Sequence, residues 1–134
     1  MEEKRADNRI IQVKKELVAC EDNLTEAKDK LRGIEDLEDS FSHLNRNIER
    51  CVDILNVSVK NRKVTNKIDH MFYDNKVSFK KTYVNLEVEK EFTQDKINEL
   101  NDKIDELNET LKEEKNKKEE LVEEKKEEKQ ENEE

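Results

Sequence analysis

Apolar residues recur along this chain at the spacing of long helices. In the first half they lie seven residues apart, at Val13, Cys20, Ala27, Ile34, Phe41, Ile48 and Leu55. Companions follow four residues later at Leu17, Leu24 and Leu31, and then three residues later at Leu37, Leu44 and Cys51. In the second half, steps of three and four join Ile97, Leu100, Ile104, Leu107 and Leu111. A heptad row is buried only against another helix, so the pattern predicts an all-α fold, an elongated antiparallel helical hairpin of coiled-coil type.

The rows are interrupted between residues 60 and 88, where four of the six aromatic residues lie. We therefore expect helices over about 8–65 and 78–120. Asn66 or Asp69 could cap the second helix. Apolar triplets at 71–73 and 77–79 flank a polar triplet, so an irregular loop and a small β-hairpin both fit this connection. Gly33 could kink or end the first helix.

The C-terminal end is charged and almost without apolar residues. Residues 112–134 contain 11 Glu and 7 Lys, with Leu121 and Val122 as the apolar members. Glutamates four residues apart repel each other on a helix. The sequence therefore predicts one helical-hairpin domain over residues 1–120 and a frayed, disordered acidic tail over 121–134.

Composition argues against catalysis and cofactor binding. Charged residues make up 47% of the chain, and there is one glycine and no proline. No glycine-rich phosphate loop and no nucleophile with a partnered histidine is recognisable, so we expect no enzyme and no cofactor. His43 and His70 do not have metal-ligand spacing. Cys20 and Cys51 lie roughly 46 Å apart on one helix, too far to form a disulfide, and are expected to be buried thiols.

Charge and hydropathy also restrict the partners. Residues 60–81 carry seven Lys or Arg and two Asp, but the whole chain has a net charge of -9, which disfavours nucleic acid. No apolar run is long enough for a membrane span, and the N-terminal residues do not resemble a cleaved signal peptide. We expect a cytoplasmic protein.

The densest local motif lies between residues 39 and 50. Its members are Asp39, Phe41, His43, Leu44, Asn45, Arg46, Glu49 and Arg50. Phe41 and Leu44 read as core positions, and the charged members as interfacial groups that select a partner. The string resembles the small helical accessory (Lap-type) proteins associated with LXG toxins of the Gram-positive type VIIb secretion system. The likeness covers roughly residues 20–115. Such proteins often carry a Trp-x-Gly-like turn, which this chain lacks.

This resemblance implies a targeting chaperone that packs against the N-terminal helical (LXG) domain of a toxin, together with a second small helical protein, and promotes their export. Tyr83 and Glu87 also resemble a Tyr-x-x-x-Asp/Glu export motif. The residues expected in the partner interface or hairpin core are Leu24, Leu31, Ile34, Phe41, Leu44, Ile48, Leu55, Ile97, Leu100, Ile104 and Leu107. Two alternatives remain open: a prefoldin-like chaperone subunit with strands in the connection, and a structural homo-oligomeric coiled coil.

Overall fold

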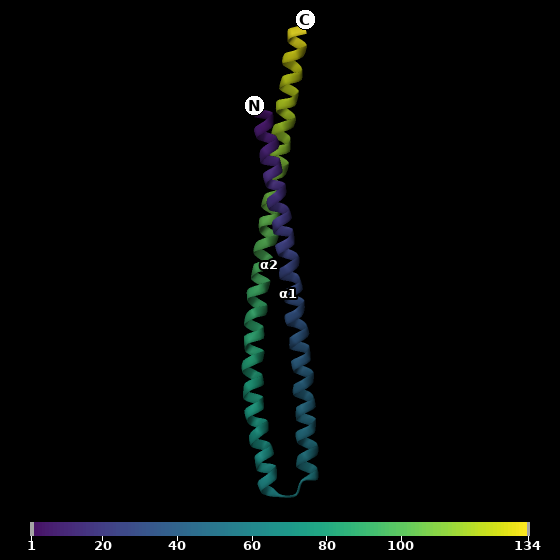
Figure 1. Ribbon diagram of the computed structural model, residues 1–134, viewed down its shortest axis with the longest axis vertical. Coiled ribbons are helices and arrows are strands. Elements are labelled where there is room, and N and C mark those ends of the chain that lie inside the picture. Colours follow the sequence, from purple (N-terminus) through teal and green to yellow (C-terminus); the bar gives the residue numbers. More distant parts are fainter. Residues whose placement is uncertain (1, 134) are drawn as a thin grey trace. The chain divides into compact units, whose positions relative to one another are not determined.

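The computed structural model describes residues 2–133, which form two α-helices joined by a three-residue connection (Figure 1). Helix α1 spans Glu2–Ser58 and helix α2 spans Arg62–Glu133. The predicted all-α helical hairpin is confirmed. Helix α1 is about as long as the predicted 8–65 but begins and ends earlier, whereas α2 is much longer than the predicted 78–120, so the connection lies earlier than predicted. Residues 62–88 are helical, so the loop or small β-hairpin expected between the predicted helices, at about 66–77, was wrong, and the described residues contain no strand.

Asn61 explains why the second helix starts where it does. Its side-chain Oδ1 accepts a hydrogen bond from the backbone N–H of Lys63 at 3.0 Å, and its carbonyl accepts one from Thr65 N–H at 3.0 Å. These are the bonds of a helix N-cap, which satisfies otherwise unpaired N–H groups. Asn61, and neither Asn66 nor Asp69, therefore caps α2. Just before it, Val59 N–H donates to the carbonyl of Leu55 and completes the last turn of α1.

The chain divides into two compact units, which we describe separately. Unit 1 comprises Met1–Ala27 with Lys96–Glu134, and unit 2 comprises Lys28–Asp95. Each unit pairs a segment of α1 with a segment of α2. The pairing is antiparallel in both: in unit 1 Glu3, Asp7 and Arg9 meet Lys125, Lys118 and Glu114 respectively, and in unit 2 Lys30 and Phe41 meet Glu89 and Phe79.

Unit 1 holds most of the buried apolar side chains. They follow steps of three and four along both helices, at Ala6, Ile10, Val13, Leu17, Cys20, Ile97 and Leu100. Each is at most 8% exposed. Burial of this row removes apolar surface from water at about 25 cal/mol per Å² and is the main stabilising term of this unit.

The acidic end of α2 differs from the predicted disordered tail, since helix continues through Glu133 and Leu121 and Val122 are half-buried. The row of Ile97 to Leu111 continues at the same steps through Glu114, Lys118, Leu121 and Lys125. Its polar members find partners on α1, because Arg9 Nε lies 3.0 Å from Glu114 and Lys125 Nζ lies 3.1 Å from Glu3. Ion pairs thus continue the packing where apolar residues run out.

Unit 2 is packed less tightly. Ile34 is its one buried hydrophobic residue, while Phe41, Ile48, Val52, Ile68, Phe72, Phe79 and Leu86 are half-buried. Phe41 and Phe79 meet edge to face with ring centroids 5.3 Å apart. The Glu38 carboxylate is 3.5 Å from Lys90 Nζ. Helix α1 continues unbroken through Gly33, whose missing side chain faces open space, so no break or C-cap occurs there.

Candidate helix-binding surface

Beyond Ile34, the apolar companions Leu37, Leu44 and Cys51 do not lie in the half-buried row of α1 that faces α2. From there the half-buried companions are Glu38, Asn45 and Val52, which keep the steps of unit 1. Leu37 and Leu44 are each 50% exposed, and Cys51 is exposed although we expected a buried thiol. These three residues therefore lie beside the hairpin interface and face outward.

They belong to a row of seven exposed side chains that carries no charge. With steps of three and four, this row comprises Leu37, Ser40, Leu44, Asn47, Cys51, Ile54 and Ser58. We call it the uncharged row. Nearly half of the chain is charged, at 47%, so a solvated helix face would normally be interrupted by Lys or Glu within this length. A face of this composition is typical of a helix that packs against another helix.

A shallow groove lies next to the uncharged row. It has a volume of about 640 Å³ and is lined by Ile48, Val52, Leu55, Ile68, Met71, Phe72, Asp74, Asn75 and Ser78. Ile48 is four residues after Leu44 and three before Cys51, so the row forms the α1 rim of this groove. Met71 is 72% exposed on the α2 side. The groove and the row together offer apolar area that no described residue covers.

A second groove lies on the other flank of the same helix pair. Its volume is about 270 Å³, and its lining comprises Phe41, Ser42, Asn45, Lys76, Phe79, Lys80 and Tyr83. The lining includes two lysines and no carboxylate. Lys76 Nζ also lies 5.8 Å from the centre of the Phe72 ring, within the range of a cation–π contact.

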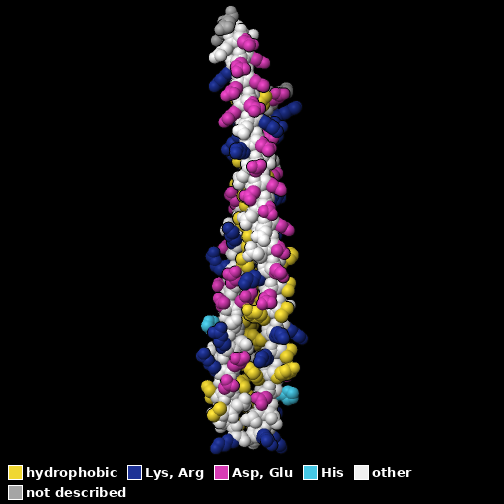
Figure 2. Space-filling model, turned by 180° about the vertical axis from the view of Figure 1, so that it is seen from behind, with side chains coloured by type: hydrophobic (Ala, Val, Ile, Leu, Met, Phe, Trp, Pro, Cys, Tyr) yellow, Lys and Arg dark blue, Asp and Glu magenta, His cyan; other side chains and the backbone are white. Residues whose placement is uncertain are grey.

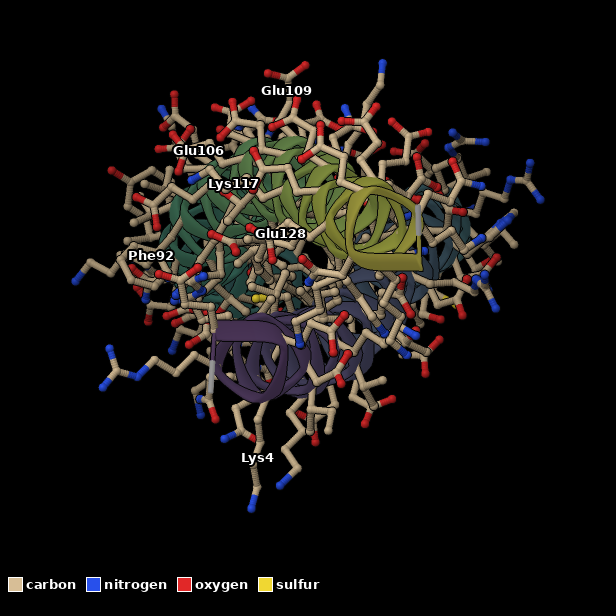
Figure 3. All side chains as sticks on the ribbon, turned by 90° about the horizontal axis from the view of Figure 1, so that it is seen from above. Lys4, Phe92, Glu106, Glu109, Lys117 and Glu128 are labelled. Atoms are coloured by element: carbon tan, nitrogen blue, oxygen red, sulfur yellow. The ribbon has the colours of Figure 1, made fainter. Side chains whose placement is uncertain are left out.

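Further apolar residues point outward from α2. Val77, Val84 and Val88 are 40%, 49% and 59% exposed, and Phe92 is 70% exposed. Figure 3 shows Phe92 extending away from the ribbons, as the charged residues Lys4 and Glu109 do. Figure 2 shows hydrophobic side chains gathered on one face of unit 2.

The motif residues surround these surfaces. Asp39, His43, Arg46 and Arg50 are exposed, whereas Asn45 and Glu49 are half-buried. Tyr83 is 38% exposed and lines the second groove, and Glu87 is exposed one turn later on the same helix. The structure thus brings Tyr83 next to Phe41 of the motif.

The residues expected in the interface or core separate into two groups. Ile34, Ile97 and Leu100 are buried, and the half-buried members are Leu24, Leu31, Phe41, Ile48, Ile104 and Leu107. All nine lie along the facing rows of the hairpin. Leu44 and Leu55 are 50% and 43% exposed, and these two are available to a partner.

The described residues offer no local basis for metal binding or for a disulfide. No group of three or more His, Cys, Asp or Glu within residues 2–133 is arranged to hold a metal ion. Cys20 is buried in unit 1 as expected, and both thiols are free. The pKa of Lys118 is raised chiefly by its hydrogen bond to Asp7 and by the charge of that carboxylate.

No protein-family model matches this sequence, and comparison with curated proteins and with solved structures finds no similar chain. No helix among the described residues has an apolar segment long enough to cross a membrane.

Sequence reasoning missed several residues that the structure makes important. Ala6 and Ile10 extend the α1 row toward its start, and Thr93 is 3% exposed with its hydroxyl donating to the Glu89 carbonyl at 2.7 Å. Glu114 is also buried. The alternation of three and four steps contains all four positions, and it identifies them when polar residues are allowed in the row.

Proposed function

We propose that this protein is a non-enzymatic helix-binding protein that packs against the N-terminal helical domain of an LXG-type toxin and promotes its export by type VIIb secretion. The observation that supports helix binding best is the uncharged row beside the groove of Ile48 and Met71. The identity of the partner rests on the resemblance carried by residues 39–50.

In this proposal a partner helix lies along the groove, with its apolar face against the uncharged row. Burial of a Leu or Met side chain contributes about 1.5–3 kcal/mol, so Leu37, Leu44 and Met71 can supply a large part of a useful affinity. No charge on the row has to be desolvated when the helix binds, which removes a common cost of association.

Charged neighbours would then set the choice of partner. Exposed Arg46 and Arg50 on α1 and Lys67 and Lys81 on α2 favour acidic positions on the incoming helix. The second groove, with Tyr83 and two lysines, gives a separate place for the second small helical protein that the resemblance implies. Two grooves on opposite flanks allow both partners to bind at once.

The binding step is tested by co-purification with the N-terminal helical domain of an LXG toxin encoded beside this gene. Replacing Leu44 and Met71 by Asp places one charge in the uncharged row and one in the groove, and should reduce capture at least tenfold. The matched control replaces Ile11 and Val18, which are 51% and 56% exposed in unit 1, by Asp. Equal capture by both double variants would contradict a binding site in unit 2.

Export is tested in the producing cell. Deletion of the gene should lower toxin secretion, and the wild-type gene should restore it, while the variant with Asp at positions 44 and 71 should not. Unchanged secretion of a stable toxin after deletion would exclude a targeting role, whatever the outcome of the binding experiment.

A further inference from the structure

We propose that in the free protein a second copy of this chain covers the uncharged row, with unit 2 of one copy packed antiparallel against unit 2 of the other. The two helix pairs would form a four-helix arrangement in which both rows are buried. This inference concerns the protein without its partner and does not depend on the toxin. Three features of unit 2 favour a second copy of this chain as the occupant of the row.

The first feature is the self-compatibility of the row. A face with Lys or Glu at its centre would place like charges opposite each other when two copies meet, at a cost of several kcal/mol. Leu37, Leu44 and Cys51 impose no such cost, and they pack against the row of the other copy as apolar knobs at heptad spacing. The row is centred on Asn47, which would face its own copy across the two-fold axis and pair amide with amide.

The second feature is the charge distribution within unit 2. The half near the connection, residues 42–81, has nine Lys or Arg and four Asp or Glu, a net charge of +5. The other half, residues 28–41 and 82–95, has four Lys or Arg and nine Asp or Glu, a net charge of -5. Antiparallel pairing about Asn47 places residues 36–41 of each copy, which include Asp36, Glu38 and Asp39, opposite residues 53–58 of the other copy, next to its basic connection with Lys60, Arg62 and Lys63. Parallel pairing would place like halves together, so charge selects the antiparallel orientation.

The third feature is the contrast in net charge between the units. Unit 2 sums to zero, so the whole charge of -9 belongs to unit 1. Two copies of unit 1 repel each other, whereas two copies of unit 2 do not. The chain enters and leaves unit 2 at residues 28 and 95, and antiparallel pairing puts these junctions of the two copies at opposite ends of the paired units.

If the proposed function also holds, the partner helix and the second copy compete for the same row, and the toxin domain should convert the dimer into a complex with one copy of this chain. Separate experimental outcomes would contradict toxin binding and dimerisation. A dimer that does not bind the toxin domain would overturn only the proposed function, and a monomer that binds it would overturn only this inference.

Sedimentation equilibrium of the full chain tests the inference directly. The wild type should be a dimer at micromolar concentration and should not form higher oligomers, because an isologous two-fold contact closes on itself. Replacing Leu37 and Leu44 by Asp should raise the dissociation constant at least about 100-fold. Helical circular dichroism should be retained, since both side chains lie outside the hairpin interface. A monomeric wild type, or a dimer unaffected by these changes, would overturn the inference.

Charge reversal tests the orientation. Replacing Lys63 and Lys67 by Glu reverses the charge next to the connection, which faces the acidic residues 36–41 of the other copy, and should weaken the dimer about tenfold at low salt and less at high salt. Replacing Lys14 and Lys15 by Glu makes the same change in the already acidic unit 1 and serves as control. An equal loss in both variants would reflect net charge alone and would contradict antiparallel matching.

Oxidative cross-linking gives a third measurement. With the row centred on Asn47, Cys51 faces Leu44 of the other copy, and the two Cys51 residues are separated by about 12 Å along the helices. Disulfides need Cα atoms within about 7 Å. Leu44→Cys should therefore form covalent dimers through native Cys51, while the wild type should not. A Cys51 cross-link in the wild type would indicate parallel pairing and overturn the arrangement.

Discussion

Units 1 and 2 are built from the same two helices, but they use one heptad position in opposite ways. On α1 this position is polar in unit 1, with Arg9, Glu16 and Asn23. It is still polar at Lys30, near the start of unit 2, and seven-residue steps then continue it to Leu37, Leu44 and Cys51. Among the residues that the structure describes, seven of the eight buried hydrophobic residues lie in unit 1, and 13 of the 15 exposed large hydrophobic residues lie in unit 2. Unit 1 therefore buries most of its apolar side chains between its own two helices, whereas unit 2 keeps exposed apolar side chains that another chain can cover.

This difference indicates that the pairing of α1 with α2 and the binding of a further helix depend on different heptad positions. The facing rows decide that α1 and α2 pair, and they run through both units. The neighbouring positions decide what the pair does next, because polar side chains there keep it solvated and apolar ones offer a surface to a further helix. Substitutions at matched positions of units 1 and 2, and a change of pH, test this difference.

Leu17→Ala and Leu37→Ala remove the same atoms from the two units. Leu17 is 7% exposed and Leu37 is 50% exposed. We expect Leu17→Ala to lower the free energy of unfolding by about 2–3 kcal/mol and Leu37→Ala by less than about 1 kcal/mol. Urea denaturation followed by circular dichroism, at submicromolar protein, measures both. Equal losses would show that Leu37 also belongs to the hairpin core.

Arg9→Ala removes the partner of a buried carboxylate in unit 1. The Glu114 side chain is 11% exposed, and the substitution would leave it with Lys117 at 3.8 Å. Because a buried carboxylate without a close partner is costly, we expect a loss of about 1–2 kcal/mol in the free energy of unfolding. In unit 2, Lys30 and Glu89 are 3.6 Å apart and mostly exposed, so Lys30→Ala should cost below about 0.5 kcal/mol. A larger loss of unfolding free energy from Lys30→Ala than from Arg9→Ala would contradict the expected difference between the two ion pairs.

Asn61→Ala removes the N-cap of α2 in unit 2. The expected loss is about 1 kcal/mol, because the N–H of Lys63 loses its acceptor. Asn66→Ala is the matched control at the position that the sequence first suggested, and it should have little effect on thermal unfolding. A cap effect at residue 66 would contradict the observed start of the helix.

High pH should act on unit 1 through Lys118. Its pKa lies above the ordinary 10.5 because Asp7 hydrogen-bonds and attracts the charged amine. A raised lysine pKa means that the contribution is fully present below the unfolded-state pKa and is lost as pH rises through the folded-state value. The melting temperature should therefore fall above about pH 10.5, and Asp7→Asn should reduce that dependence slightly. An identical pH profile for the variant would exclude this pair as the cause.

The sequence predicted the hairpin because its strongest signals, the rows around Ile34 and Ile97, are apolar and regular. It misplaced the connection because aromatic and β-branched residues such as Phe72 and Val84 favour strands locally, whereas in the structure the paired helix overrides this preference. It also ended the packing at Leu111, since Glu114 and Lys118 do not look like core residues until Arg9 and Asp7 are found opposite them.

The sequence identified the apolar residues of the binding surface but not the side of the helix on which they lie. Leu37, Leu44 and Cys51 stood out as apolar residues, but periodicity alone could not say whether they or Glu38, Asn45 and Val52 face α2. The two sets differ by one residue in register, and charge argues for the wrong one, because Glu38 is an improbable interface residue until Lys90 is placed beside it. Only the three-dimensional pairing separates the hairpin face from the open face.

The three-residue connection has a consequence for the order of folding. The hydrogen bond from Asn56 to Asp69 closes a loop of 13 residues, whereas the ion pair of Glu3 and Lys125 joins residues 122 apart in sequence. Loop-closure entropy makes the second contact about 2 kcal/mol harder to form from the unfolded chain. The hairpin is therefore expected to zip from Asn61 outward. Unit 2, which is the more loosely packed unit, therefore forms first. Its uncharged row is exposed to solvent and to other chains before the core of unit 1 has formed and can stabilise the chain.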